Sequence, residues 1–171
     1  KVPGLLDPSE FFEKLHNNLS NSDSSAVVSS CFKAISRFLE NDINLPPELI
    51  EFTIHQGSEA LSGNLVCQNF DDDLSADNSQ LTLSMQVNRF FAELATKIPQ
   101  NFPINEYIDY QKHLLKNYES SENSDEFEIS QCIGVLRQLY INSTNGNDSP
   151  AITLSSIQKK FIIRAFAESL K

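Results

Sequence analysis

The stretch from Gln80 to Ile98 restricts the possible folds of this chain most strongly. Its apolar residues recur at the spacing of one helical face, at Leu83, Val87, Phe90, Phe91, Leu94 and Ile98. Two adjacent phenylalanines on such a face need a large apolar partner, because each ring buries roughly 150–250 Å². The first residues of the stretch alternate with period two, as in a strand, but no second strand candidate exists to pair with them. The sequence therefore predicts a central helix over 80–98 that other helices cover.

Further segments show helical periodicity, at about 8–20, 25–40, 47–62, 104–118, 125–141 and 152–170. The chain has only 5 glycines and 7 prolines in 171 residues, which disfavours a turn-rich β-sandwich. Short polar links between consecutive helices make them antiparallel neighbours. We therefore predict an all-α fold, with about seven helices stacked as antiparallel hairpins in a single domain over 1–171.

The hairpin units would be about 40 residues long, which is similar in layout to the repeats of HEAT and armadillo solenoids. The units share no repeated residue signature, so a globular helical bundle is the alternative architecture. The chain begins with Lys1 instead of Met, and we interpret it as a fragment of a larger protein.

The last predicted helix, over 152–170, is apolar over a wide arc. The arc comprises Leu154, Ile157, Phe161, Ile162, Ile163, Ala165, Phe166 and Leu170. A helix that is apolar nearly all round is either central or covered on both sides. We expect it to dock across the core of this domain, and the alternative is that a following segment of the parent protein packs on it.

The net charge of the chain is −10, which repels phosphate backbones and anionic lipid. No apolar run approaches the roughly 18 residues of a transmembrane helix. We therefore expect neither nucleic acid nor membrane as a partner. The three cysteines, Cys31, Cys67 and Cys132, are odd in number and far apart, which is typical of a reducing intracellular compartment, cytoplasmic or nuclear.

No motif for catalysis, metal binding or nucleotide binding is present. His16, His55 and His113 each lack a Cys or His at zinc-ligand spacing. The acidic run 71–73 fails the calcium-loop pattern, because Ala76 stands where Gly is needed and Thr82 where Glu is needed. The sequence predicts no enzymatic activity, no cofactor and no metal.

Basic residues recur four positions apart, which places each pair on one side of its helix. The pairs are Lys33 with Arg37, Lys112 with Lys116, and Lys160 with Arg164. Aligned on one surface, they would form a basic strip for an acidic peptide, a phosphopeptide or the chain's own acidic loop. The plainer alternative, favoured by how common such pairs are, is that they are ordinary solvated faces.

These features favour a non-enzymatic protein–protein interaction module, a section of a helical scaffold or adaptor. Its partner would be another protein or another segment of its parent chain. The alternative is a regulatory helical bundle that binds a small apolar ligand. Its pocket would lie beneath the aromatic residues Phe90, Phe91, Tyr107 and Phe161.

Overall fold

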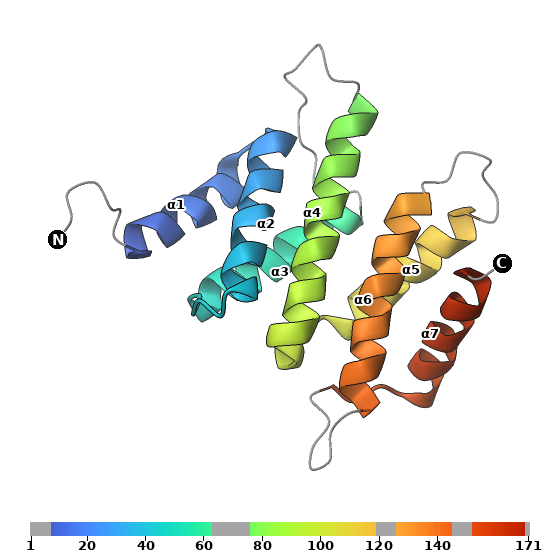
Figure 1. Cartoon of the computed structure of the whole chain (residues 1–171). Coiled ribbons are helices and arrows are strands. Elements are labelled where there is room, and N and C mark those ends of the chain that lie inside the picture. Colours follow the sequence, from blue (N-terminus) through green and yellow to red (C-terminus); the bar gives the residue numbers. More distant parts are fainter. Residues whose placement is uncertain (1–7, 63–75, 119–125, 145–151, 170–171) are drawn as a thin grey trace. The chain divides into compact units, whose positions relative to one another are not determined.

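The computed structural model describes residues 8–62, 76–118, 126–144 and 152–169 (Figure 1). This part of the chain is all-α, as predicted, and contains no strand. Its helices are α1 (Pro8–Asn21), α2 (Ser25–Glu40), α3 (Pro47–Leu61), α4 (Ala76–Lys97), α5 (Ile104–Tyr118), α6 (Glu126–Thr144) and α7 (Ser156–Ser169), with a short 3-10 helix, η1 (Pro99–Asn101), before α5. Cys67 and the acidic run 71–73 lie outside the described residues.

The chain divides into two compact units, Lys1–Val87 and Asn88–Lys171. The division falls within α4, so this single helix supplies residues to both units. Organisation as a single domain stays a prediction.

In the first unit, α1 packs against both α2 and α3. Leu15 and Leu19 are the buried residues of α1, and Phe32 and Ile35 of α2 are fully buried. The ring of Phe38 meets the rings of two α1 phenylalanines edge to face, with centroids 5.6 Å from Phe11 and 6.0 Å from Phe12. Residues 22–24 link α1 and α2, which lie side by side as the predicted hairpin (Figure 1).

Two buried hydroxyl groups in this core donate hydrogen bonds to backbone carbonyl oxygens of their own helices. Ser36 donates to the Phe32 carbonyl oxygen at 2.8 Å, and Thr53 donates to the Leu49 carbonyl oxygen at 2.6 Å. Both side chains are buried. The bonds satisfy hydroxyls that would otherwise lose their hydration without compensation.

The end of α2 is closed by a backbone motif at Asp42. The Ile43 N–H donates to the Phe38 carbonyl oxygen and the Asp42 N–H to the Leu39 carbonyl oxygen, which is the Schellman pattern. Asp42 takes a φ of 55°, a conformation that glycine adopts more easily. The chain then turns toward Pro46 and Pro47, and Pro47 is the first residue of α3, as its fixed φ favours.

In the second unit, α6 packs against both α5 and α7. The aromatic core is centred on Phe91, whose ring centroid lies 5.4 Å from Phe90, 5.7 Å from Phe102 and 5.2 Å from Tyr107. All four rings are buried. They fill the space between α4, η1 and α5.

The predicted helix over 80–98 is confirmed, but several predicted boundaries were wrong. α4 begins at Ala76, four residues before the predicted start at Gln80. α6 continues to Thr144, past the predicted end at 141; there the Asn142 side chain donates a hydrogen bond to the Ala95 carbonyl oxygen.

The predicted start of the last helix at Ile152 was also wrong. α7 starts at Ser156, and Ile152 and Leu154 are buried in the non-helical segment before it. A reciprocal capping box fixes this start. The Gln158 N–H donates to Ser155 Oγ at 3.3 Å, and the Ser155 N–H donates to Gln158 Oε1 at 2.8 Å.

Candidate functional site

The predicted basic pairs differ in what surrounds them. Lys33 and Arg37 are exposed on α2 in the first unit. Lys112 on α5 is exposed, but its ammonium group pairs at 2.6 Å with the Asp109 carboxylate on the same helix. Lys116 belongs to α5, but its side chain lies outside the described set. Because the pairs occur in two separate units, one continuous basic strip stays a prediction.

The last pair, Lys160 and Arg164, lies on the outward side of α7. At 100° per residue these positions fall between Ile157 and Ile163 around the helix. Ile157 is 78% exposed and Ile163 is 52% exposed, whereas Ile162 and Ala165 on the opposite side are buried. We call Ile157, Lys160, Ile163 and Arg164 the α7 outer face. It combines two large aliphatic groups with two positive charges.

The last helix was expected to dock across the core of the domain, and in the structure only one side of α7 is buried. Within the described residues, Leu154, Ile162 and Ala165 are buried, but Phe161 and Phe166 are partly exposed and the two isoleucines reach solvent. One sequence signal was available. Lys160 and Arg164 share a side with Ile157, and basic residues mark the solvent side of a helix.

A side-chain hydrogen bond joins α7 to α5. Gln158, which also closes the capping box, donates a hydrogen bond from Nε2 to Asn105 Oδ1 at 2.9 Å. Asn105 lies in the first turn of α5. One side chain thus sets where α7 begins and also joins it to α5.

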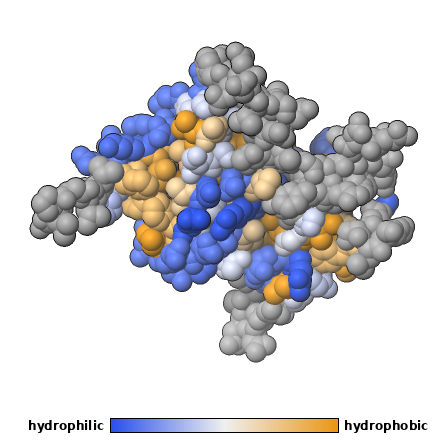
Figure 2. Space-filling model, turned by 45° about the horizontal axis from the view of Figure 1, so that its top comes forward, coloured by the Kyte–Doolittle hydropathy of each residue, from blue (hydrophilic) through white to orange (hydrophobic). Residues whose placement is uncertain are grey.

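Among the described residues, large aliphatic side chains are exposed at Val27, Ile43, Ile157 and Ile163. Figure 2 shows hydrophobic residues reaching the surface between hydrophilic ones on the face drawn there. Ile157 is the most exposed of the four, and it is one of the two that share a helix. The α7 outer face is therefore the described surface where aliphatic exposure is most concentrated.

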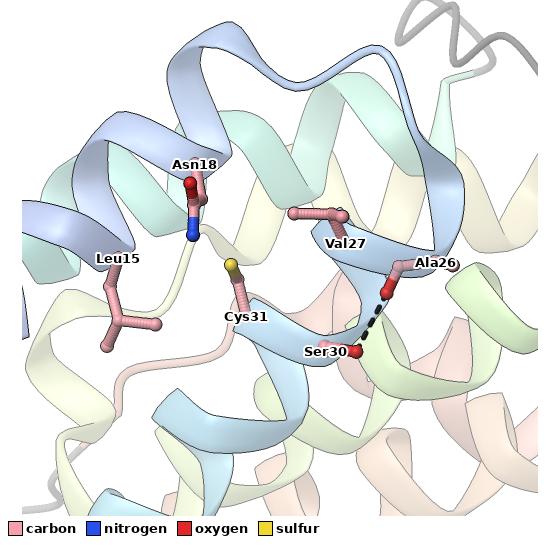
Figure 3. Close-up of a pocket in the computed structure, with 6 residues that line it drawn as sticks. All are labelled: Leu15, Asn18, Ala26, Val27, Ser30 and Cys31. Carbon is pink, nitrogen blue, oxygen red and sulfur yellow. Dashed lines mark hydrogen bonds between the residues drawn. The ribbon is translucent and has the colours of Figure 1, made fainter.

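A second surface feature is an open groove of about 360 Å³ between α1 and α2 (Figure 3). It is lined by Leu15 and Asn18 of α1 and by Ala26, Val27, Ser30 and Cys31 of α2. The Ser30 hydroxyl donates to the Ala26 carbonyl oxygen at 2.8 Å, so its polarity is partly satisfied within the helix. The lining offers apolar contact and few polar groups.

The Cys31 thiol points toward the α1 side of this groove (Figure 3). Its side chain is only 4% exposed. Burial raises the pKa of the thiol above its ordinary value, because the thiolate would lose hydration. Cys31 therefore holds little thiolate at neutral pH and is a poor nucleophile.

Polar groups also meet inside the second unit, at Asn88, Tyr107 and Cys132. The Tyr107 hydroxyl donates to Asn88 Oδ1 at 2.8 Å, and Cys132 Sγ lies 3.6 Å from the same oxygen. Burial, followed by the charge of Cys132, raises the pKa of Tyr107 well above its ordinary value. All three side chains are buried, so this cluster joins α4, α5 and α6 and offers no surface to a substrate.

The histidines show no shared site. The centroids of the His16 and Phe52 rings lie 4.2 Å apart. His55 and His113 are exposed on different helices. In the part of the chain that the structure describes, no group of three or more His, Cys, Asp or Glu side chains is placed to hold a metal ion.

None of the described helices is both long enough and apolar enough to cross a membrane. Comparison with known proteins adds no relative: no family model, curated protein or solved structure matches the chain.

Proposed function

We propose that this chain is a non-enzymatic protein-interaction module, a section of a larger intracellular helical scaffold or adaptor. The observation that carries the proposal is the exposure of Ile157 and Ile163 on one side of α7. Burying an aliphatic side chain of this size contributes about 1.5–3 kcal/mol. A partner that covers both side chains would gain much of that free energy.

The proposal includes a solenoid-like stacking of helical hairpins, with a globular bundle as the alternative. Support comes from the packing of α1 on α2 and of α6 on α5 and α7, each a contact between sequence neighbours. Repeat arrays are built from such local contacts and offer extended surfaces to partners. The intracellular assignment is supported by Cys31 and Cys132, which form no disulfide within the described residues.

The test is an affinity capture from the source cells, with the full chain as bait and bound proteins identified by mass spectrometry. We expect a protein that is retained by the wild type and lost by the Ile157→Ser, Ile163→Ser double variant. Ile43→Ser is the matched control, because Ile43 is also exposed, at 43%, but lies between α2 and α3. The captured protein is then expressed, purified and bound to the chain in isolation. The proposal fails if no captured protein depends on the two isoleucines.

A second candidate function is binding of a small apolar ligand. The predicted pocket beneath the aromatic residues is a different place from the groove: there the rings of Phe90, Phe91 and Tyr107 pack on one another. The feature that favours ligand binding is the groove between α1 and α2. A thermal-shift screen of lipids and metabolites would detect it. The stabilisation should disappear in Cys31→Leu, where a longer aliphatic side chain fills the base of the groove.

A further inference from the structure

We propose that the α7 outer face binds an acidic, amphipathic helix of another protein. This inference rests on the proposed function and adds the chemistry of the partner. It depends on two properties of the same face, which are its exposed aliphatic groups and its positive charge.

The arrangement of residues on the face favours a helical partner. Ile157 and Ile163 are six residues apart, which corresponds to about 9 Å along the α7 axis. They also lie about 120° apart around α7, with Lys160 between them in one row of residues three positions apart. A helix that crosses α7 obliquely along this row can meet both isoleucines with apolar residues one heptad, about 10.5 Å, apart. Helices packed side by side are 8–10 Å apart, so carboxylates flanking the facing apolar residues can reach the basic groups between them. This is the recognition of an amphipathic helix through its apolar anchors.

The charge of the chain selects an acidic partner. Lys159, Lys160 and Arg164 fall within six residues of one another, on a chain whose net charge is −10 and which has 13 basic residues in all. An acidic helix is therefore repelled by most of the protein and attracted locally by α7. This distribution of charge steers an acidic partner toward α7 during association and adds to the affinity of the complex.

The same chemistry disfavours an anionic membrane as the ligand. An interfacial helix inserts a broad apolar face into the bilayer, whereas the buried residues Ile162 and Ala165 of α7 face the protein. The outer face would insert only two aliphatic side chains. The net charge of −10 adds repulsion from anionic headgroups.

The probe is a fluorescein-labelled synthetic peptide of about 20 residues, with Leu at every seventh position flanked by Glu. A scrambled peptide has the same composition, with its leucines spread around the helix. Binding to the full-length chain is followed by fluorescence anisotropy at about 50 mM and about 300 mM NaCl. We expect the patterned peptide to bind more tightly than the scrambled one, and to bind more weakly at the higher salt.

The variants separate the two contributions. Lys160→Glu with Arg164→Glu should weaken binding about three- to tenfold, as expected for exposed ion pairs. Ile157→Ser with Ile163→Ser should weaken it about tenfold or more. The matched control, Lys33→Glu with Arg37→Glu, makes the same charge change on α2 and should have little effect. Circular dichroism verifies that each variant is folded.

Several results would overturn the inference. The first is that the scrambled peptide binds as tightly as the patterned one. The second is that the α2 control loses as much affinity as the Lys160→Glu, Arg164→Glu variant. The third is that phosphatidylserine vesicles bind through α7 while the patterned peptide does not bind. A captured protein that needs the isoleucines but is not displaced by the patterned peptide would keep the proposed function and reject the acidic helix. If no captured protein needs the isoleucines, the proposed function itself fails.

Discussion

The Tyr107 hydroxyl donates a 2.8 Å hydrogen bond to Asn88 Oδ1, and both side chains are buried. The bond connects α5 to α4, and the Cys132 thiol of α6 approaches the same oxygen. Polar groups in a packed core are tolerated when they satisfy one another, and the need for specific partners also fixes how the helices fit together.

Tyr107→Phe should lower the free energy of unfolding by about 1–2 kcal/mol, because it removes the stronger of the two donors to a buried oxygen and leaves only the weak Cys132 thiol. Urea unfolding followed by circular dichroism measures the change. Tyr140→Phe is the matched control, since Tyr140 lies in the same unit but is only partly buried. Equal losses in the two variants would contradict a special role for the Tyr107 bond.

The raised pKa of Tyr107 predicts a loss of stability at alkaline pH. Above about pH 10 this tyrosine ionises in the unfolded chain, while in the folded protein its raised pKa keeps it protonated. The folded state then binds more protons, so stability falls with rising pH by up to about 1.4 kcal/mol per unit, until the folded-state pKa is reached. Tyr107→Phe lacks this contribution. The difference in unfolding free energy between wild type and variant should therefore shrink as pH rises from about 9 to about 11. A constant difference would show that Tyr107 ionises normally.

Phe90→Ala should destabilise the protein by about 3–5 kcal/mol, because the ring is fully buried and lies 5.4 Å from that of Phe91. Phe161→Ala should have a smaller effect, about 1–2 kcal/mol, since Phe161 is partly exposed on α7. Thermal and chemical unfolding of both variants give the comparison. Equal losses would mean that Phe161 is more deeply packed than its exposure indicates.

Ser155→Ala should lower stability by about 1 kcal/mol, because it removes the oxygen that caps the Gln158 N–H at the start of α7. Ser156→Ala is the control, since Ser156 is exposed at the first position of the helix. Hydrogen exchange at the first turn of α7 should increase in the Ser155 variant. No increase there would argue against the cap.

Asp42→Gly should raise stability by about 1 kcal/mol, because glycine adopts the positive φ at the end of α2 without a Cβ penalty. The control is Asn44→Gly in the same link, where φ is not positive. There glycine only adds freedom to the unfolded chain and should be slightly destabilising. If both substitutions destabilise the protein, the positive φ of Asp42 does not cost stability at the end of α2.

Helical periodicity was sufficient to predict the fold class, because each face that buries Phe90 or Ile35 repeats every 3.6 residues. The boundaries depended on side chains that act locally. Ser155 and Gln158 show a capping signature in the sequence, and reading it would have placed the start of α7 correctly. The contact of Asn142 with Ala95 has no such signature, because its partner is 47 positions away.

The sequence predicted the basic residues of the α7 outer face but not its exposed isoleucines. Spacing identified Lys160 and Arg164, and the Asp109–Lys112 ion pair could also have been read from its three-residue separation. The exposure of Ile157 and Ile163 was missed, because a helix that is apolar on most sides does not reveal which side is covered. The pairing of Asn88 with Tyr107 and Cys132 likewise depends on tertiary packing.

The passage of α4 through both compact units has a consequence for cooperativity. Leu83 and Val87 are buried residues of the first unit, and Phe90 and Phe91 are buried residues of the second, yet all four belong to one uninterrupted helix. Unwinding α4 in one unit would remove backbone hydrogen-bond partners from the next turn of the same helix in the other unit. The two units should therefore melt together in a single transition, with neither persisting as a stable intermediate after the other has unfolded.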